Sequence, residues 1–396
     1  MRVQLTLLAL SSSVLLSLGP AACGSGSSGT SGSSGSSGSG SSGGSSGGSG
    51  SSSGASGSSS GGSGGSSGGS SGGSSSGGSS GGSSGSSSGG SSGSSSGGSS
   101  GSSSGGSGGG ALQTIFLILM ENNNWSTIKG NSSAPYINNT LLTHAQASWC
   151  TNYYDNPTMQ HPSEPNYIWL EAATNALSDH TFTTDDDPSA SNSTASTAHL
   201  ATMLTAKGLK WRGYAEDISG NDCPTSSSGT YAAKHVPFLF FQDIVGNPPS
   251  SSNATCKANI RPYTELATDL TAGTVAQYNF ISPNLCDDMH GATGCPSDLI
   301  AAGDTWLSQQ IPIIMASSAY TNNGAIFITW DESEGGEFPI GMIALSPKAK
   351  GNGYQSTTKY YHSSMVRTVE DVFGLTPLIA DAANQPNLSD LFKSFP

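Results

Sequence analysis

Two apolar segments that lie far apart in the chain are each followed by side chains able to bind a cation. The segments 114–120 and 325–330 are rich in β-branched and aromatic residues, and each runs directly into two residues with oxygen donors. Carboxylate and amide oxygens are the ligands that hard divalent cations prefer. We therefore expect a site for one or two divalent metal ions, although acids also mark strand ends where no metal binds. The expected ligands are Glu121, Asn122, Asp331 and Glu332.

A serine at the start of an apolar helical pattern is the expected nucleophile. Ser163 lies between Pro162 and Glu164, a place where a serine ordinarily caps the helix N-terminus. The same N-terminus attracts anions such as phosphate, and a nearby metal would lower the pKa of the hydroxyl and activate it. His161 would then bind the phosphate oxygens, and Thr158 is the alternative nucleophile.

Two of the seven histidines lie next to expected element boundaries. His290 follows a predicted strand and comes two residues after Asp288, and His362 precedes a predicted helix. Histidine carries protons at neutral pH and is a common metal ligand, so we expect both residues in the site, as ligands or as acid and base. The histidines without such a context are expected to be structural or exposed: His144, His180, His199 and His235.

The order of apolar patterns predicts an α/β fold with a doubly wound, mainly parallel sheet. Short continuous apolar runs are typical of strands buried on both faces, and helical patterns alternate with them. In such sheets the site lies at the carboxyl ends of the strands, where the two acidic segments would meet. The predicted strands are 114–120, 147–154, 209–214, 275–282, 325–330 and 340–346. The predicted helices are 134–142, 168–174, 193–207, 305–317 and 363–373.

The first 110 residues are expected to contribute nothing to the folded core. Residues 1–23 resemble a secretory signal peptide in which Cys23 follows small residues, as the lipidated cysteine of a bacterial lipoprotein does. Residues 24–110 are almost wholly Ser and Gly, which is typical of a flexible linker. The folded domain is then 111–396. We expect a secreted protein, or one tethered to the outer surface of a bacterial cell through Cys23.

The charge of the chain argues against a nucleic-acid partner. The chain has 26 acidic and 13 basic residues, a formal net charge of −13, and every one of them except Arg2 lies after residue 110. Affinity for a phosphate backbone depends on basic residues. An acidic protein can still process a small phosphorylated molecule when cations lie in its pocket.

Cysteines in the folded segment are expected to form disulfides, since a secreted context permits them. The close pair Cys286–Cys295 is the first choice and Cys223–Cys256 the second, which leaves Cys150 over. No Cys-x-x-Cys spacing occurs, so these cysteines do not predict a zinc site.

Five motifs, in their order along the chain, resemble a known family. It is the phosphoesterase family of secreted acid phosphatases and bacterial phospholipases C, which is placed in the alkaline phosphatase superfamily. The resemblance covers about residues 112–390. The motifs are Met120-Glu-Asn122, His161-Pro-Ser-Glu-Pro-Asn-Tyr167, Pro283-Asn284 with Asp288-Met-His290, Trp330-Asp-Glu332, and Tyr361-His362 with Arg367-Thr-Val-Glu-Asp371.

The resemblance implies an alkaline-phosphatase-like fold and roles for these residues. Ser163 matches the nucleophile, the four oxygen ligands match the metal site, and His362 would donate a proton to the leaving group. The second cluster, which in the superfamily holds a second metal or the substrate phosphate, would consist of Asp288, His290 and His362. The residues expected to bind the substrate are His161, Asn166 and Asp288.

The implied reaction is hydrolysis of a phosphomonoester through a phosphoserine. The substrate would be a small phosphorylated molecule or a phospholipid head group. A phospholipase C or another phosphodiesterase with the same site is the first alternative, and a non-catalytic surface protein on a Ser/Gly stalk is the second. A Ser-His-Asp hydrolase is less favoured, because no Gly-x-Ser-x-Gly turn surrounds Ser163.

Overall fold

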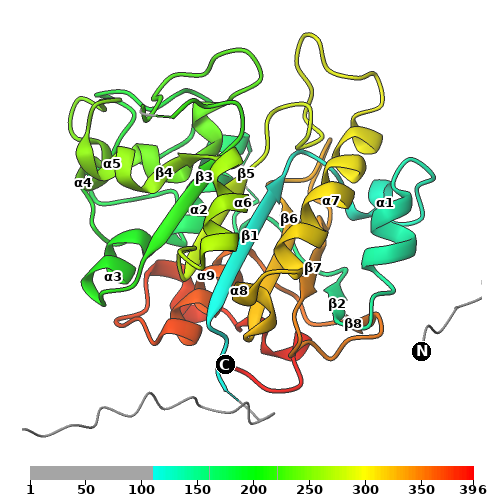
Figure 1. Cartoon of the computed structure of the whole chain (residues 1–396). Helices are drawn as coiled ribbons and strands as arrows, with labels where there is room; N and C mark the ends of the chain where they lie inside the picture. Colours follow the sequence, from blue (N-terminus) through cyan, green and yellow to red (C-terminus); the bar gives the residue numbers. More distant parts are fainter. Residues whose placement is uncertain (1–109, 160, 221) are drawn as a thin grey trace, which may run out of the picture. The chain divides into compact units, whose positions relative to one another are not determined.

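A computed structural model of the chain describes residues 110–159, 161–220 and 222–396. The expected signal peptide, Cys23 and the Ser/Gly segment lie outside the described residues. Within the described part, one sheet of eight strands forms the centre of the domain (Figure 1). In order across the sheet, the strands are β4 (Ile260–Pro262), β3 (Trp211–Ala215), β5 (Tyr278–Ser282), β1 (Thr114–Met120), β6 (Gly324–Trp330), β7 (Met342–Leu345), β2 (Ala147–Cys150) and β8 (Tyr354–Ser356).

The two strands that carry the acidic segments are direct neighbours at the middle of this sheet. β1 pairs in parallel with β6, and the last residues of the two strands, Met120 and Trp330, are partners in the register. The residues that follow them, Glu121 and Asp331, therefore leave the sheet side by side. Both strands are buried along their whole length, as their continuous apolar sequence predicts.

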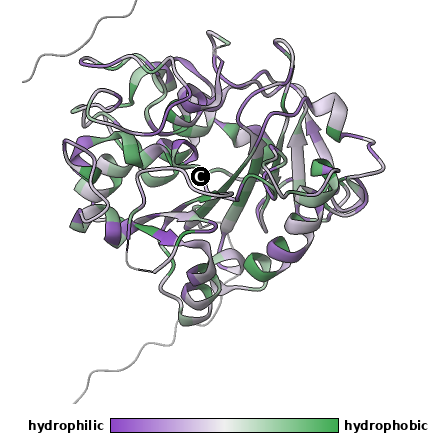
Figure 2. Cartoon of the chain, turned by 90° about the horizontal axis from the view of Figure 1, so that it is seen from above, coloured by the Kyte–Doolittle hydropathy of each residue, from purple (hydrophilic) through white to green (hydrophobic). Residues whose placement is uncertain are grey.

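Helices cover both faces of the sheet, which confirms the predicted doubly wound α/β fold. Figure 1 shows α6 and α7 in front of the strands and α2 and α9 behind them. Seen from above, the strands are mostly hydrophobic and the surrounding loops mostly hydrophilic (Figure 2). The helices are α1 (Trp125–Ile128), α2 (Ser163–Ala172), α3 (Leu200–Ala206), α4 (Gln242–Val245), α5 (Ala254–Asn259), α6 (Leu266–Ala272), α7 (Leu299–Met315), α8 (Ser318–Thr321) and α9 (His362–Phe373).

The sixth predicted strand exists but runs against its neighbours. β7 is antiparallel to both β6 and β2, whereas all other pairs among the named strands are parallel. A parallel connection needs a crossover of a dozen or more residues, usually through a helix. The segment between β6 and β7 is short and contains no helix, so the chain turns back at the edge where the site lies.

Only the second half of the predicted helix 193–207 is present. Only Leu200–Ala206 is helical, and residues 193–199 before it are not. The reason lies in side chains that bind the backbone: the Asp179 carboxylate accepts hydrogen bonds from the Thr194 hydroxyl and from the Ala195 amide, at 2.5 and 2.7 Å. Such local hydrogen bonds compete with helix formation.

The other departures concern short or weak elements. The expected helix 134–142 is a single π-helical turn, Ile137–Leu141, and the expected helix 168–174 begins earlier, at Ser163. Strands β4 and β8 have three residues each, too few for an apolar pattern to predict them. Short 3₁₀ turns complete the fold: Ala233–His235, Pro237–Phe240, Tyr263–Glu265, Ala380–Asn384 and Leu388–Leu391.

Both predicted disulfides are present. Cys223 is bonded to Cys256 and Cys286 to Cys295, while Cys150 is free and buried. The second bridge closes the loop after β5, which carries Asp288 and His290. No helix in the described segments is long and apolar enough to cross a membrane.

Candidate active site

The loops that follow β1, β5 and β6 are tied together by hydrogen bonds at the carboxyl edge of the sheet. The Glu121 amide donates to the Asp288 carbonyl at 2.7 Å, and the Asn122 amide donates to the Asp331 carboxylate at 3.0 Å. The Asp331 amide in turn donates to the carbonyl of Met120 at 2.9 Å. These bonds hold acids from three neighbouring strands in one place.

Helix α2 brings the expected nucleophile to Glu121. Ser163 is the first residue of α2 and makes no capping hydrogen bond, since the capping position is Pro162. Its hydroxyl donates to Glu121 Oε2 at 3.2 Å, and one turn further on the Tyr167 hydroxyl donates to Glu121 Oε1 at 2.6 Å. The Ser163 hydroxyl also contacts Asp331, where its hydrogen bond lowers the pKa of the carboxyl. Ser163 therefore lies between two buried carboxylates.

Thr158, the alternative nucleophile, does not contact these carboxylates. It is exposed, and its hydroxyl donates to the Asn156 side chain at 2.7 Å. The position of the hydroxyl favours Ser163.

Glu332 is held by residues from two other segments of the site. One carboxylate oxygen accepts a hydrogen bond from the Asn122 amide group at 3.2 Å, and the other accepts one from Asn166 at 2.9 Å. His161 Nδ1 lies 2.9 Å from the same second oxygen. The structure thus brings Asn166 and His161, both expected to bind the substrate, against an expected metal ligand.

His235 belongs to this cluster, contrary to our expectation that it is structural or exposed. Its Nε2 lies 3.2 Å from Glu121 Oε1 and its Nδ1 lies 3.6 Å from Asp288 Oδ2. The ring stacks on Tyr167, with 4.7 Å between centroids and an angle of 4° between the planes. Burial lowers the pKa of His235 well below its ordinary value, so the imidazole is neutral. No strand precedes His235 directly, so the sequence offers no signal that places it at this edge.

The two histidines that we expected in the site differ in burial. His362 is fully buried, with Nε2 2.6 Å from the Asp331 carbonyl and Nδ1 3.2 Å from the Tyr153 hydroxyl. Because a carbonyl only accepts, Nε2 carries the proton and Nδ1 accepts from Tyr153. Burial lowers the pKa of His362 to about 3. These contacts occupy both ring nitrogens of His362 and tie the ring to the Asp331 loop, and its expected role as proton donor stays a prediction.

His290 is exposed at the surface of the site. Its Nδ1 lies 2.9 Å from the carbonyl of Gly291, and its positive charge, when protonated, lowers the pKa of Asp331. Its amide donates to Asp288 Oδ1 at 2.7 Å. His290 is therefore tied to the cluster through its backbone, while its ring faces solvent.

Burial and mutual repulsion shift the titration of the clustered acids. Burial, and then the neighbouring carboxylates, raises the pKa of Glu121 and the pKa of Asp288 well above the usual range. Burial raises the pKa of Asp331 to about 6, and burial together with Asp331 raises the pKa of Glu332 to about 9. Four acids at one buried point repel one another unless protons or cations compensate them.

The donor set fits a divalent cation. Buried atoms that find no hydrogen-bond partner among the described residues include Asn122 Oδ1, Asp331 Oδ2, Asp288 Oδ2 and both ring nitrogens of His235. Ligand atoms of Glu121, His235 and Asp288 all lie within 4.8 Å of one another. Buried carboxylates without compensation are costly, and a bound cation removes that cost.

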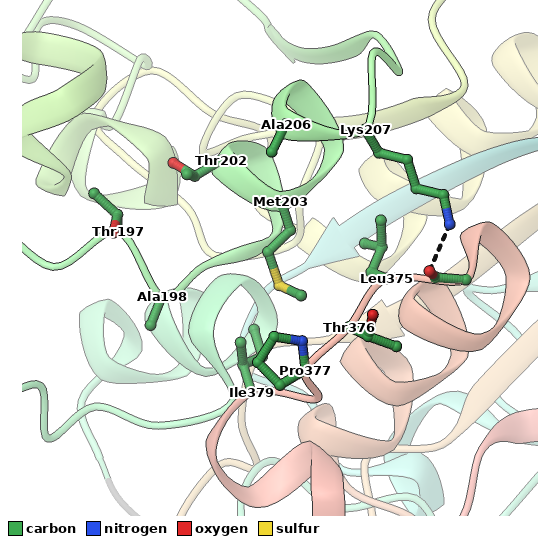
Figure 3. A pocket seen from close by; sticks show the side chains of 11 residues that line it. Thr197, Ala198, Thr202, Met203, Ala206, Lys207, Leu375, Thr376, Pro377 and Ile379 are labelled. Carbon is green, nitrogen blue, oxygen red and sulfur yellow. Dashed lines mark hydrogen bonds between the residues drawn. The ribbon is translucent and has the colours of Figure 1, made fainter.

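Two pockets differ in their relation to these residues. A pocket of about 590 Å³ opens beside the cluster and is lined by Asn122, Met289, His290 and Glu334, among others. An apolar pocket of about 520 Å³ lies between α3 and the end of α9 and contains none of the expected site residues (Figure 3). In Figure 3, Lys207 reaches from α3 to the carbonyl of Gly374, at 2.5 Å. The first pocket is the one that a substrate of this site would enter.

Comparison with known proteins agrees with the resemblance of the motifs. The profile of the Phosphoesterase family matches residues 142–376, more than half of the chain. This match assigns the chain to the hydrolases of phosphate esters. It belongs to the Phosphoesterase family.

Several curated proteins are similar in sequence. A phosphatidylinositol-3-phosphatase of Mycobacterium tuberculosis is 29% identical over 281 residues, which covers 70% of this chain and 82% of that protein. A probable acid phosphatase of Kluyveromyces lactis is 26% identical over 272 residues, or 66% of this chain and 58% of that one. A phosphate-repressible acid phosphatase of Penicillium chrysogenum is 26% identical and covers 58% of this chain. The chain spans little more than half the length of these two fungal relatives.

Solved structures resemble the chain more distantly. Murine ectonucleotide pyrophosphatase/phosphodiesterase 5 has a TM-score of 0.45 and 11% identity, and covers 71% of this chain and 100% of its own. A protein of the alkaline phosphatase superfamily from Vibrio parahaemolyticus has a TM-score of 0.45 and 11% identity, with 72% of each chain covered.

Proposed function

We propose that this phosphoesterase is a metal-dependent phosphomonoesterase that works through a phosphoserine on Ser163. The observation that carries the proposal is the position of the Ser163 hydroxyl, 3.2 Å from Glu121 Oε2 in a cluster of buried carboxylates. An ordinary capping serine occupies the N-cap, whereas Ser163 is the first residue inside α2 and its hydroxyl donates to Glu121.

The oxygen-rich cluster would hold the metal. Its expected ligands are Glu121, Asn122, Asp331 and Glu332, with His235 and Asp288 as further ligands beside them. A divalent cation bound there supplies positive charge that lowers the pKa of a hydroxyl and neutralises phosphoryl oxygens.

The chain's own groups account for the proton movements. The Ser163 oxygen attacks phosphorus and forms the O–P bond, and its proton passes to the Glu121 carboxylate with which it is hydrogen-bonded. The bond between phosphorus and the ester oxygen breaks, and His290, whose ring is exposed at the pocket, protonates the departing alcohol. A water molecule then gives a proton to His290 and forms the new O–P bond, the bond between phosphorus and the Ser163 oxygen breaks, and Ser163 takes its proton back from Glu121 as inorganic phosphate leaves.

The remaining polar groups would hold the phosphate. His161 and Asn166 lie against Glu332 and can donate to phosphoryl oxygens when these displace the carboxylate from their N–H groups. The first amides of α2 add the favourable field of a helix N-terminus. The alcohol part of the substrate would occupy the pocket beside His290.

The substrate would be a small phosphorylated molecule or the phosphorylated head group of a phospholipid. The names of the relatives, acid phosphatases and a phosphatidylinositol-3-phosphatase, support monoesters as a class. Secretion, with or without a lipid on Cys23, fits the two disulfides, since these form in oxidising compartments.

The test is hydrolysis of a chromogenic phosphomonoester and a chromogenic phosphodiester, side by side, before and after chelation. We expect turnover of the monoester that is lost with the chelator and restored by a divalent metal. Turnover of the diester alone would transfer the proposal to the phosphodiesterases, including phospholipase C. No turnover of either substrate with metals restored would favour the non-catalytic binding protein.

A further inference from the structure

A second group of side chains that could bind a metal lies beside the candidate active site, and its residues come from two loops. Asp155 follows β2, His161 precedes α2, and Glu337 lies in the loop between β6 and β7. One ligand atom from each of the three lies within 4.8 Å of the others. Neither Asp155 nor Glu337 belongs to the five motifs of the phosphoesterase resemblance.

Asp155 gives an independent sign of a missing counter-charge. The residue is only 2% exposed, and its Oδ2 finds no hydrogen-bond partner among the described residues. Burial, with Glu337 and Asp331 adding repulsion, raises the pKa of this carboxyl to about 7. A buried carboxylate oxygen without a partner is costly, and a bound cation would remove that cost.

His161 is oriented as a metal ligand would be. Its Nδ1 lies 2.9 Å from Glu332 Oε2, while Nε2 faces Glu337 Oε1 at 3.3 Å. A proton on Nδ1 would be donated to the Glu332 carboxylate, which leaves the lone pair of Nε2 directed at the group. A carboxylate that orients a histidine through its distal N–H is the usual support of a histidine ligand.

We propose that Asp155, His161 and Glu337 bind a divalent transition-metal ion at a site whose ligands are distinct from the carboxylate cluster around Ser163. Two carboxylates and one imidazole suit Zn²⁺ or Mn²⁺ better than Ca²⁺, which prefers oxygen ligands only. Because His161 and Glu337 are partly exposed, the ion would exchange with solvent.

The same ion would link the expected metal site around Glu332 to the segment before α2. Glu332, an expected ligand of the first metal, orients His161, a ligand of the second. The ion would fix the loop between β6 and β7 to the segment before α2. The site does not depend on Ser163 being the nucleophile.

The test is metal content and Mn²⁺ affinity of the full chain, measured by mass spectrometry of metals and by calorimetry. The key variant is Glu337→Gln, which removes one exposed ligand and leaves the core untouched. The matched control is Glu334→Gln, an exposed acid in the same loop whose carboxylate lies outside the group. Asp331→Asn reports on the active-site metal.

The proposal predicts that Glu337→Gln binds one ion per chain fewer than the wild type, or binds it at least about tenfold more weakly. Glu334→Gln keeps the wild-type content, and Asp331→Asn loses an ion that Glu337→Gln retains. Unchanged content and affinity in Glu337→Gln overturn the second site, as does loss of one single ion in both Glu337→Gln and Asp331→Asn. An ion lost in Glu337→Gln but retained in Asp331→Asn, with no other bound, supports this site while refuting the metal of the proposed function.

Discussion

At the scale of single residues, the buried carboxylate of Glu121 holds the serine in place but is costly to the stability of the fold. Glu121 accepts hydrogen bonds from Ser163 and from Tyr167, and it lies within 3.2 Å of His235. A fully buried carboxylate with neighbouring acids would destabilise the fold unless protons, donors or cations compensate it. The donors on α2 supply part of that compensation and, in doing so, fix the serine oxygen.

The first prediction concerns Ser163→Ala. We expect kcat to fall by at least about 10³-fold, because loss of a nucleophile that works with its neighbours costs on that order or more. The thermal midpoint should fall only slightly, because Tyr167 still donates to Glu121 when the Ser163 hydroxyl is lost. Steady-state kinetics on a phosphomonoester, together with thermal unfolding, checks both.

Thr158→Ala is the control for that experiment and should keep nearly full activity, since its hydroxyl contacts only Asn156 among the described partners. An active Ser163→Ala enzyme with an inactive Thr158→Ala enzyme would reverse the assignment of the nucleophile.

At the scale of elements, three kinds of segment position the chemistry. Strands β1 and β6 deliver their acids by pairing in register, α2 delivers Ser163 and Tyr167, and the loop after β5 delivers Asp288 and His290. The loop is the least regular of the three. The bond between Cys286 and Cys295 encloses it and restricts its conformations.

The second prediction follows from that bridge. Replacing Cys286 and Cys295 together by Ser should lower the free energy of unfolding by about 2–3 kcal/mol, as the loop-closure estimate gives for a short loop. We also expect a lower kcat/KM, because Asp288 and His290 would lose their fixed position. Chemical denaturation and kinetics of the double variant measure the two effects.

Replacing Cys150 by Ala is not a disulfide change and serves as the comparison, since Cys150 is free. If the double variant loses stability but keeps full kcat/KM, the bridge stabilises the fold without ordering the catalytic loop.

At the scale of the whole molecule, the buried acids connect the site to the stability of the domain. The chain carries a formal net charge of −13, and its acids outnumber its bases at the catalytic edge as elsewhere. Without a cation, the folded state must keep protons on acids that the unfolded chain would release. The stability of the metal-free protein should therefore depend on pH in a definite direction.

The third prediction is that the metal-free protein loses stability between pH 7 and pH 9. The pKa of Glu332 is raised from 4.5 to about 9, so above pH 4.5 the folded chain holds a proton that the unfolded chain releases. The stabilisation that this proton gives is complete below pH 4.5 and is lost as the pH rises through 9. We expect the melting temperature to fall by at least about 2 °C, the shift that roughly 1 kcal/mol gives in a large domain.

Glu332→Gln should flatten this pH dependence, and a saturating divalent metal should reverse it by favouring the ionised carboxylates. Differential scanning calorimetry with and without chelator measures both. A metal-free melting temperature that rises toward pH 9 would show that another group compensates the cluster.

Sequence alone was sufficient wherever the signal is local. The continuous apolar runs identified β1 and β6 and predicted the doubly wound sheet. The acids after those strands, the serine at the start of α2 and the pairing of four cysteines were also predicted. Each of these depends on neighbours in the chain, or on the rule that parallel strands end at one edge. The Ser/Gly segment and the lipid tether remain predictions.

Only the tertiary structure decided which side chains meet. His235 had no local signal, and it reaches Glu121 and Asp288 because its short turn packs against α2. The sequence likewise did not predict that β7 is antiparallel or that His362 makes buried contacts. The group of Asp155, His161 and Glu337 joins the segment between β2 and α2 to the loop between β6 and β7. Such contacts depend on how loops of separate elements pack together, and no periodicity along the chain encodes that packing.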